Sequence, residues 1–245
     1  MKPIKLLNHS TRIKRAIYRV VWSNPLRQPK SILWQELNRL GRNATFLDVG
    51  ANDGLSGSPV AEFILQKGWR GVMVEPVWHV FERLSENYRG QAGVTLINAA
   101  VSDETGYRDF WYLERNTELL PGYDQLGSFD KACLLASAEK MFPGYEKYLK
   151  SQSVPCVAMR VLPYLLASRK KRFDVVLVDA EGADAMIVRQ IDFQVNPPKL
   201  IIYEHIHLPK AEQEALGVFL KGHGYTLKSE AGDTLAVNEG LMRDA

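Results

Sequence analysis

Cysteine is scarce in this sequence, and several familiar signatures are missing. Only Cys133 and Cys156 occur among the 245 residues, and no Cys/His cluster has the spacing of a zinc site. These absences argue against a disulfide framework and favour a reducing compartment. No run of about 18 apolar residues predicts a transmembrane helix, and no signal-peptide pattern opens the chain. We therefore expect a cytoplasmic protein without a metal site.

Acidic residues are absent from the first 30 positions, which carry eight lysines and arginines. The rest of the chain carries 23 basic and 28 acidic residues, so no nucleic-acid-binding face is expected there. Apolar residues at helical spacing predict a basic amphipathic helix over residues 10–22. Two interpretations of it stay open. The helix packs on the main domain, or residues 1–30 make peripheral contact with an anionic membrane or an anionic substrate.

A second helix is expected from a cap at Ser31 to Leu40, with Gly41 as its end. We therefore divide the chain into a basic N-terminal helical segment, 1–40, and a main domain, 41–245. In the main domain, short apolar runs alternate with helical patterns. The predicted strands are 45–49, 71–75, 94–98, 173–179 and 199–204, the predicted helices are 58–67, 77–88, 183–191 and 209–221, and a hairpin of 225–229 with 234–238 ends the chain.

This alternation is typical of an α/β fold with a Rossmann-like, mostly parallel sheet, to which the hairpin adds an antiparallel C-terminal edge. Two of the runs, VVLVD and LIIYE, are apolar almost throughout, as strands covered on both faces should be. Residues 107–160 interrupt the rhythm with glycines, prolines and aromatics. We interpret them as an insertion over the strand ends, the natural place for substrate selection.

The string DVGANDG, residues 48–54, follows the first predicted strand and precedes a helix. Glycine in such a turn lets the backbone approach a ligand closely. The spacing departs from the G-x-G-x-x-G of nicotinamide-binding proteins. An acid two positions before the first glycine suits a ligand with a positive amino group and no phosphate, as in adenosylmethionine. The residues expected to bind it are Asp48, Gly50, Asn52 and Gly54.

The next two strands end in further candidates. Glu75, followed by Pro76, stands where Rossmann-like folds place an acid that accepts hydrogen bonds from ribose hydroxyls. The third strand ends in Ala99 and Ala100, whose small side chains leave room for an adenine ring. A close-packed strand end explains the two alanines equally well.

The two late strands end in titratable groups. Asp179 ends the predicted strand VVLVD, and Glu181 lies two residues further on. Both stand at the edge where open α/β sheets bind ligands. They suit the methionine amino group, a substrate hydroxyl or a metal, whereas Asp184 suits the first turn of a helix. His205 follows the strand LIIYE, and a neutral imidazole there can take a proton from a hydroxyl. The proton acceptor is thus His205, or Asp179 with Glu181.

Taken together, the blocks FLDVGANDG, VMVEP, VTLINAAVSDETG, VVLVDAEGADAMIV and LIIYEH resemble the FkbM-type family of methyltransferases, in order and spacing. The resemblance covers roughly residues 44–205. It implies a class I methyltransferase fold and methyl transfer from S-adenosylmethionine, usually to oxygen. Family members often have lysine two residues before the D-x-E-G aspartate, where this chain has Leu177.

Carried over residue by residue, the resemblance implies that Asp48, Gly50 and Asn52 form the cofactor loop. Glu75 matches the ribose acid, and Asp179 and Glu181 match the late acidic motif. Residues 1–40 and 107–160 match nothing specific, so the acceptor is left open. We expect a sugar or glycan hydroxyl, with a secondary metabolite as the next choice.

Two other functions remain as alternatives. One is a non-catalytic adenosylmethionine-binding scaffold that docks on a partner or membrane through its basic N-terminus. The other is a nicotinamide oxidoreductase, which the missing G-x-G-x-x-G disfavours.

Overall fold

The structure is a computed structural model that describes residues 31–56, 58–120, 122–166 and 171–243. The amphipathic helix expected over residues 10–22, and with it the membrane contact expected for residues 1–30, lies outside these ranges. None of the helices within them has the length and apolarity needed to cross a membrane.

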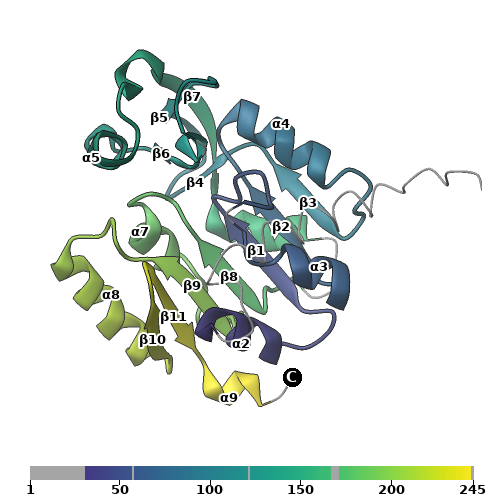
Figure 1. The fold of residues 1–245 in the computed structure, drawn as a ribbon. Helices are drawn as coiled ribbons and strands as arrows, with labels where there is room; N and C mark the ends of the chain where they lie inside the picture. Colours follow the sequence, from purple (N-terminus) through teal and green to yellow (C-terminus); the bar gives the residue numbers. More distant parts are fainter. Residues whose placement is uncertain (1–30, 57, 121, 167–170, 244–245) are drawn as a thin grey trace, which may run out of the picture.

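A seven-stranded sheet forms the centre of the molecule, in the order β10-β11-β9-β8-β1-β2-β3 (Figure 1). Neighbouring strands are parallel from β9 to β3, and the hairpin of β10 and β11 pairs antiparallel with β9. The strands are β1 (Thr45–Val49), β2 (Arg70–Val74), β3 (Val94–Ile97), β8 (Val175–Val178), β9 (Leu200–Glu204), β10 (Thr226–Glu230) and β11 (Asp233–Val237). The predicted mostly parallel sheet with an antiparallel C-terminal hairpin is confirmed.

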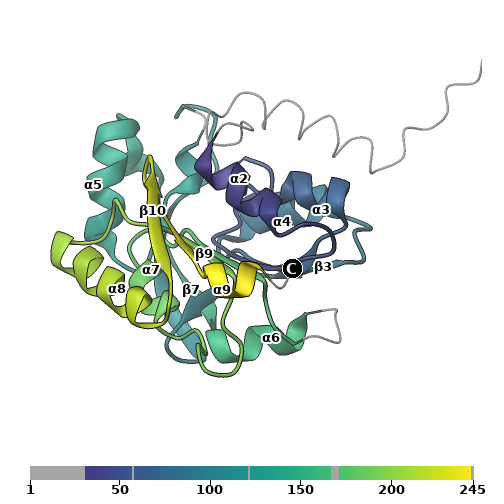
Figure 2. The ribbon, with the colours of Figure 1, turned by 90° about the horizontal axis from the view of Figure 1, so that it is seen from below.

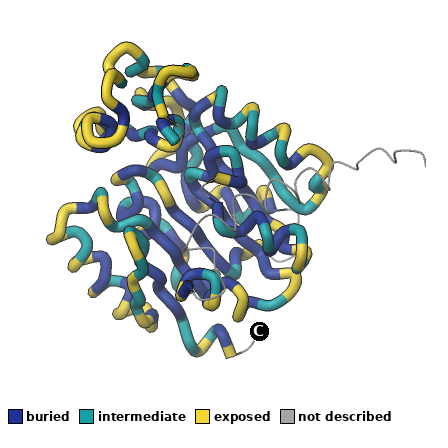
Figure 3. The backbone as a smooth tube through the Cα atoms, viewed as in Figure 1, coloured by how far each residue is buried: buried dark blue, intermediate teal, exposed yellow. Residues whose placement is uncertain are grey.

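Helices cover both faces of this sheet (Figure 2). Those on one face are α2 (Ile32–Arg39), α3 (Ala61–Lys67) and α4 (Trp78–Asn87), with the short α9 (Glu239–Met242) at the sheet's end. Those on the other are α6 (Leu162–Leu165), α7 (Asp184–Val188) and α8 (Lys210–Gly222). Figure 3 shows the central strands as the most continuously buried part of the chain.

Successive strand residues alternate between the two apolar cores. Along β1, Phe46 packs with α2 and α3, whereas Leu47 and Val49 pack in the core that includes α7 and α8. This period of two is the ordinary geometry of a strand. It places Asp48 on the same face as Phe46.

Two helix starts illustrate how local hydrogen bonds set element boundaries. α2 begins where it was predicted to, because the Ser31 hydroxyl accepts the Trp34 amide at 3.0 Å. α3 begins at Ala61, three residues later than expected. The Ser58 hydroxyl accepts the Val60 amide at 3.3 Å, a local turn that competes with the helix.

A second sheet, in the order β4-β7-β5-β6, is formed largely by the stretch 107–160 (Figure 1). Its strands are β4 (Ala100–Ser102), β5 (Gly106–Leu113), β6 (Gly127–Ser128) and β7 (Leu149–Ala158), and α5 (Lys131–Met141) packs against them. Short 3-10 turns η2 (Tyr123–Gln125), η3 (Tyr145–Tyr148) and η4 (Met159–Val161) complete it. This sheet and α5 lie beyond the carboxyl edge of the main sheet.

The turn after β1 passes against the segment that follows β8. Gly50 has φ +78°, and a Cβ built on it would lie 1.8 Å from the carbonyl oxygen of Asp179. Two hydrogen bonds hold the backbone in place: the amide of Gly50 donates to Val74 O at 3.0 Å, and the amide of Asp179 donates to Val49 O at 2.9 Å. Only glycine fits this position, because any Cβ would collide with backbone.

We expect Gly50→Ala to lower the free energy of unfolding by about 2–5 kcal/mol. The left-handed conformation costs alanine about 1–2 kcal/mol, and the forced contact adds about 1–3 kcal/mol. Urea denaturation measures the change.

Gly90→Ala is the matched control. Gly90 has φ +82°, and its added Cβ would meet nothing within 4 Å. Alanine at position 90 should therefore lose only the conformational part of the free energy. Equal losses in the two variants would show that the contact with Asp179 does not constrain the turn.

Candidate functional site

A cavity of about 730 Å³ lies between the carboxyl edge of the main sheet and the second sheet. Its main-sheet wall includes Gly50, Asn52, Glu75, Pro76, Ala99 and Ala100. Strands β1 and β8 are neighbours although β2 and β3 intervene in sequence, so the chain changes direction here. Open α/β sheets bind their ligands at this kind of switch point.

Asn52 and Glu75 are joined by hydrogen bonds. The Asn52 amide donates to Glu75 Oε2 at 3.1 Å, and the Val77 amide donates to Glu75 Oε1 at 2.8 Å. Burial raises the pKa of Glu75 to about 8 despite these two amides, which act in the opposite direction. A ligand hydroxyl that donated to this carboxylate would favour its charged form.

Two residues expected to bind cofactor do not line the cavity. Asp48 lies on the face of β1 that packs with α2 and α3, because it alternates with Val49. Gly54 lies against α4, where a Cβ would come within 2.3 Å of the Tyr88 ring. The tight packing of that turn, and not contact with a ligand in the cavity, requires glycine at 54.

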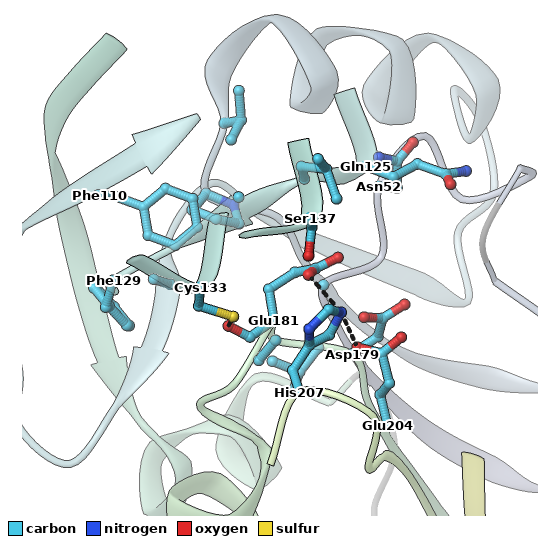
Figure 4. A pocket seen from close by; sticks show the side chains of 18 of the residues that line it. Asn52, Phe110, Gln125, Phe129, Cys133, Ser137, Asp179, Glu181, Glu204 and His207 are labelled. Atoms are coloured by element: carbon cyan, nitrogen blue, oxygen red, sulfur yellow. Dashed lines mark hydrogen bonds and ion pairs between the residues drawn. The ribbon is translucent and has the colours of Figure 1, made fainter. Parts of the chain in front are cut away.

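The opposite end of the cavity is acidic. Asp179 and Glu181 follow β8, Glu204 ends β9, and His207 lies three residues further on (Figure 4). His207 Nε2 is 3.1 Å from Glu181 Oε2 and 3.4 Å from Glu204 Oε2. Asp179 lines the cavity, so its accessible surface faces an enclosed space within the protein (Figure 4).

Burial is the largest cause of the raised pKa values of these carboxyl groups, and nearby carboxylates add to it. Burial and the charge of Asp48 raise the pKa of Asp179 to about 6. The charge of Asp179 adds to burial at the other two groups, where the pKa of Glu181 is raised to about 9 and that of Glu204 to about 10. Burial, with the charge of Lys140, lowers the pKa of His207. A positively charged ligand would therefore stabilise the charged form of these carboxyl groups.

Asp184 has a structural position. It begins α7, as its predicted place in a first helical turn requires, and is fully buried. Its carboxylate accepts the amides of Gly182 at 3.2 Å and Glu204 at 3.3 Å. It thereby fixes the loop after β8 to the end of β9.

His205 does not face the cavity, contrary to the expected position of a proton acceptor. Its Nδ1 is 3.0 Å from the hydroxyl of Thr234 on β11, and its amide donates to Gly232 O. The imidazole of His205 lies against the antiparallel hairpin that pairs with β9. His207 follows the turn after β9 and lines the cavity.

The second sheet contributes a wall that sequence reasoning left unassigned. Phe110 and Phe129 pack edge to face with ring centroids 5.2 Å apart, and Cys133 and Ser137 on α5 face the acidic end (Figure 4). The Cys133 thiol lies 3.3 Å from Glu181 O. No motif marks these residues, whereas the i, i+3 spacing of Glu204 and His207 could have indicated a pair.

One contact joins this wall to the loop after β1. Asn52 Nδ2 donates to Asp124 O at 2.9 Å, and the Asp124 carboxylate forms an ion pair with Arg83 of α4. The 3-10 turn that carries Asp124 therefore lies beside the loop after β1.

The family described as the methyltransferase FkbM domain matches residues 48–227, most of the chain. No curated protein matches. Among solved structures, the FkbM methyltransferase of Methylobacillus flagellatus KT is 12% identical, with a TM-score of 0.48 over 94% of this chain and 55% of the other.

Two further structures are similar at the same level. Aeropyrum pernix fibrillarin, solved with natively bound S-adenosyl-L-methionine, is 12% identical, with a TM-score of 0.43 over 81% of this chain and 68% of its own. The precorrin-6y C5,15-methyltransferase of Geobacter metallireducens GS-15 is 11% identical, with a TM-score of 0.40 over 87% and 90%. The mostly parallel sheet with helices on both faces is Rossmann-like, and the chain belongs to the FkbM family of S-adenosylmethionine-dependent methyltransferases.

Proposed function

We propose that this protein methylates a hydroxyl oxygen of a sugar or glycan, with the hydroxyl of a secondary metabolite as the next candidate. One observation carries the proposal: one cavity of about 730 Å³ is lined both by the loops after β1 and β2, with Ala99 and Ala100, and by the carboxyl groups after β8 and β9. Its volume is in the range that encloses small organic ligands.

The residues at the β1–β3 end fit the cofactor. Ala99 and Ala100 give a small-residue wall for adenine, and the Glu75 carboxylate is placed to accept from the ribose hydroxyls. S-adenosylmethionine supplies a methyl group on a positively charged sulfur, so the electrophile is already activated when it binds.

The acidic end fits an acceptor rich in hydroxyls. Carboxylates accept hydrogen bonds from hydroxyl groups, and the rings of Phe110 and Phe129 offer an apolar wall to the C–H face of a sugar. We assign the acceptor's proton to Asp179, since its carboxylate opens onto the cavity between the cofactor recess and Glu204. In this proposal Asp179 takes the role of proton acceptor that sequence analysis offered to His205. Correct placement of the hydroxyl would supply much of the remaining acceleration.

Glu75→Gln should weaken adenosylhomocysteine binding by roughly 10- to 100-fold. A hydrogen bond to a charged group contributes about 1.5–3 kcal/mol. Because burial raises the pKa of Glu75 to about 8 and the ribose hydroxyls favour its charged form, wild-type affinity should also strengthen as pH rises through 8. Calorimetry at several pH values measures both effects.

The exposed Glu104 supplies the control, because it lies outside the cavity. Glu104→Gln should leave both the affinity and its pH dependence unchanged. An affinity equal in wild type and Glu75→Gln at every pH would remove Glu75 from the cofactor site.

Asp179→Asn should lower turnover by about 10²–10⁴-fold, the usual contribution of a positioned base, while cofactor affinity falls much less. Turnover is followed as adenosylhomocysteine release with a panel of sugars and glycans, which also identifies the acceptor. A protein that binds cofactor yet releases none with any acceptor would support the scaffold alternative.

His205→Ala is the comparison variant. Since its imidazole contacts Thr234, turnover should stay near that of the wild type. If His205→Ala instead removed turnover and Asp179→Asn kept it, the histidine would be the base and the assignment to Asp179 would be wrong.

A further inference from the structure

Three potential metal ligands, from one strand end and two loops, converge at the acidic end of the cavity. They are Glu181 in the loop after β8, Glu204 at the end of β9, and His207 in the loop that follows. One ligand atom from each lies within 4.8 Å of the others. Figure 4 shows the three side chains pointing toward one another.

Their spacing is that of atoms bound to one ion. Ligands about 2.1 Å from a metal lie roughly 3.0–3.4 Å apart at neighbouring octahedral or tetrahedral positions. His207 Nε2 is 3.1 Å from Glu181 Oε2 and 3.4 Å from Glu204 Oε2. Small side-chain adjustments would therefore place all three around a common centre.

Acidic groups outnumber basic ones around the three ligands, although Lys140 lines the same cavity. Glu204 is repelled by four nearby carboxyl groups, which are those of Asp179, Glu181, Asp184 and Asp233. Within the described part of the chain, no lysine or arginine forms an ion pair with any of these five carboxylates, and His207 is the one basic group paired with Glu181 and Glu204.

One oxygen of the cluster lacks a hydrogen bond. Glu204 Oε2 exposes less than 1 Å² and accepts none from the described residues, although it points at His207 Nε2. Buried polar atoms are rarely left in this state. An electropositive group among the three side chains would satisfy this oxygen, and an ion would do so without a hydrogen-bond angle to meet.

We propose that Glu181, Glu204 and His207 bind a divalent transition-metal ion of the Mn²⁺ or Zn²⁺ type. Two carboxylates with one imidazole suit these ions better than Mg²⁺ or Ca²⁺, which take oxygen ligands. Sequence analysis expected no metal site because no Cys/His cluster has zinc spacing, although it named a metal as one possible ligand of Asp179 and Glu181. Three protein ligands leave coordination positions open on the cavity side.

An acceptor hydroxyl fits one of those open positions. Coordination lowers the pKa of a bound hydroxyl, as it does for water, and eases transfer of its proton to Asp179. This role rests on the proposed function, whereas metal binding itself does not. The rival explanation of the geometry is a protonated His207 that bridges the two carboxylates.

Binding is tested with Mn²⁺ as the probe. The full-length protein is freed of metal with a chelator and titrated with Mn²⁺ while electron paramagnetic resonance follows the free ion. We expect one bound ion per chain, displaced by Zn²⁺. Glu204→Gln and His207→Ala should each weaken Mn²⁺ binding by about 10- to 100-fold or more. Substituting residues that only support the ligands of a metal site already lowers metal affinity by about that factor.

Matched controls are Glu214→Gln and His223→Ala, which change exposed residues of α8 or its end and should bind Mn²⁺ as the wild type does. Adenosylhomocysteine affinity, measured in every variant, verifies that the fold is intact. Wild-type protein that leaves Mn²⁺ free, or ligand variants that bind it as tightly as the controls, would overturn the proposal and favour the bridging imidazolium.

The two proposals fail differently. A chelated protein that binds no Mn²⁺ but still methylates an acceptor would refute the metal site and leave the proposed function standing. Mn²⁺ binding at these residues in a protein without methyl transfer to any hydroxyl would do the reverse.

Discussion

The contact between Gly50 and the carbonyl of Asp179 is the constraint on which the site depends. It holds the turn after β1 against the segment after β8, two strands that are neighbours in the sheet and more than a hundred residues apart in sequence. The part of the cavity proposed to bind the cofactor begins on one side of this contact, and the acidic cluster lies on the other. A larger residue at position 50 would separate the two halves, because the obstacle is backbone and cannot rotate away.

Burying several carboxyl groups together is costly, and the fold meets the cost unevenly. Asp184 is fully buried but accepts backbone amides, which favour its charged form and make it a fixed structural element. Glu181 and Glu204 have His207 alone as a paired basic group within the described residues. Glu181 also has φ +48°, a conformation that a non-glycine residue rarely holds without a surrounding constraint. The Ser128 hydroxyl, which donates to Glu181 O at 2.8 Å, provides one.

The main sheet was predictable because its strands are apolar runs between helical patterns. Each of these patterns can be recognised from the residues of that segment alone. The second sheet was not predictable. β7 carries Pro155 within it and pairs with β5 across a long excursion, so its pattern resembles a loop. Sequence also places a residue at a strand end more reliably than on a given side of it. Asp48 and His205 both end up facing neighbouring elements, whereas Glu75 and Glu181 face the cavity.

The division of the site between two sheets follows from the same topology. The main sheet supplies most of the motif blocks, and the second sheet and its surroundings supply Phe110, Phe129 and α5, which lie in none of those blocks although the family match spans them. Asp124 links the two, since its backbone holds Asn52 and its side chain holds Arg83. A segment anchored in this way is held against the loop after β1. If that loop binds the cofactor as proposed, side chains on α5 can change to suit another acceptor without moving the proposed cofactor residues.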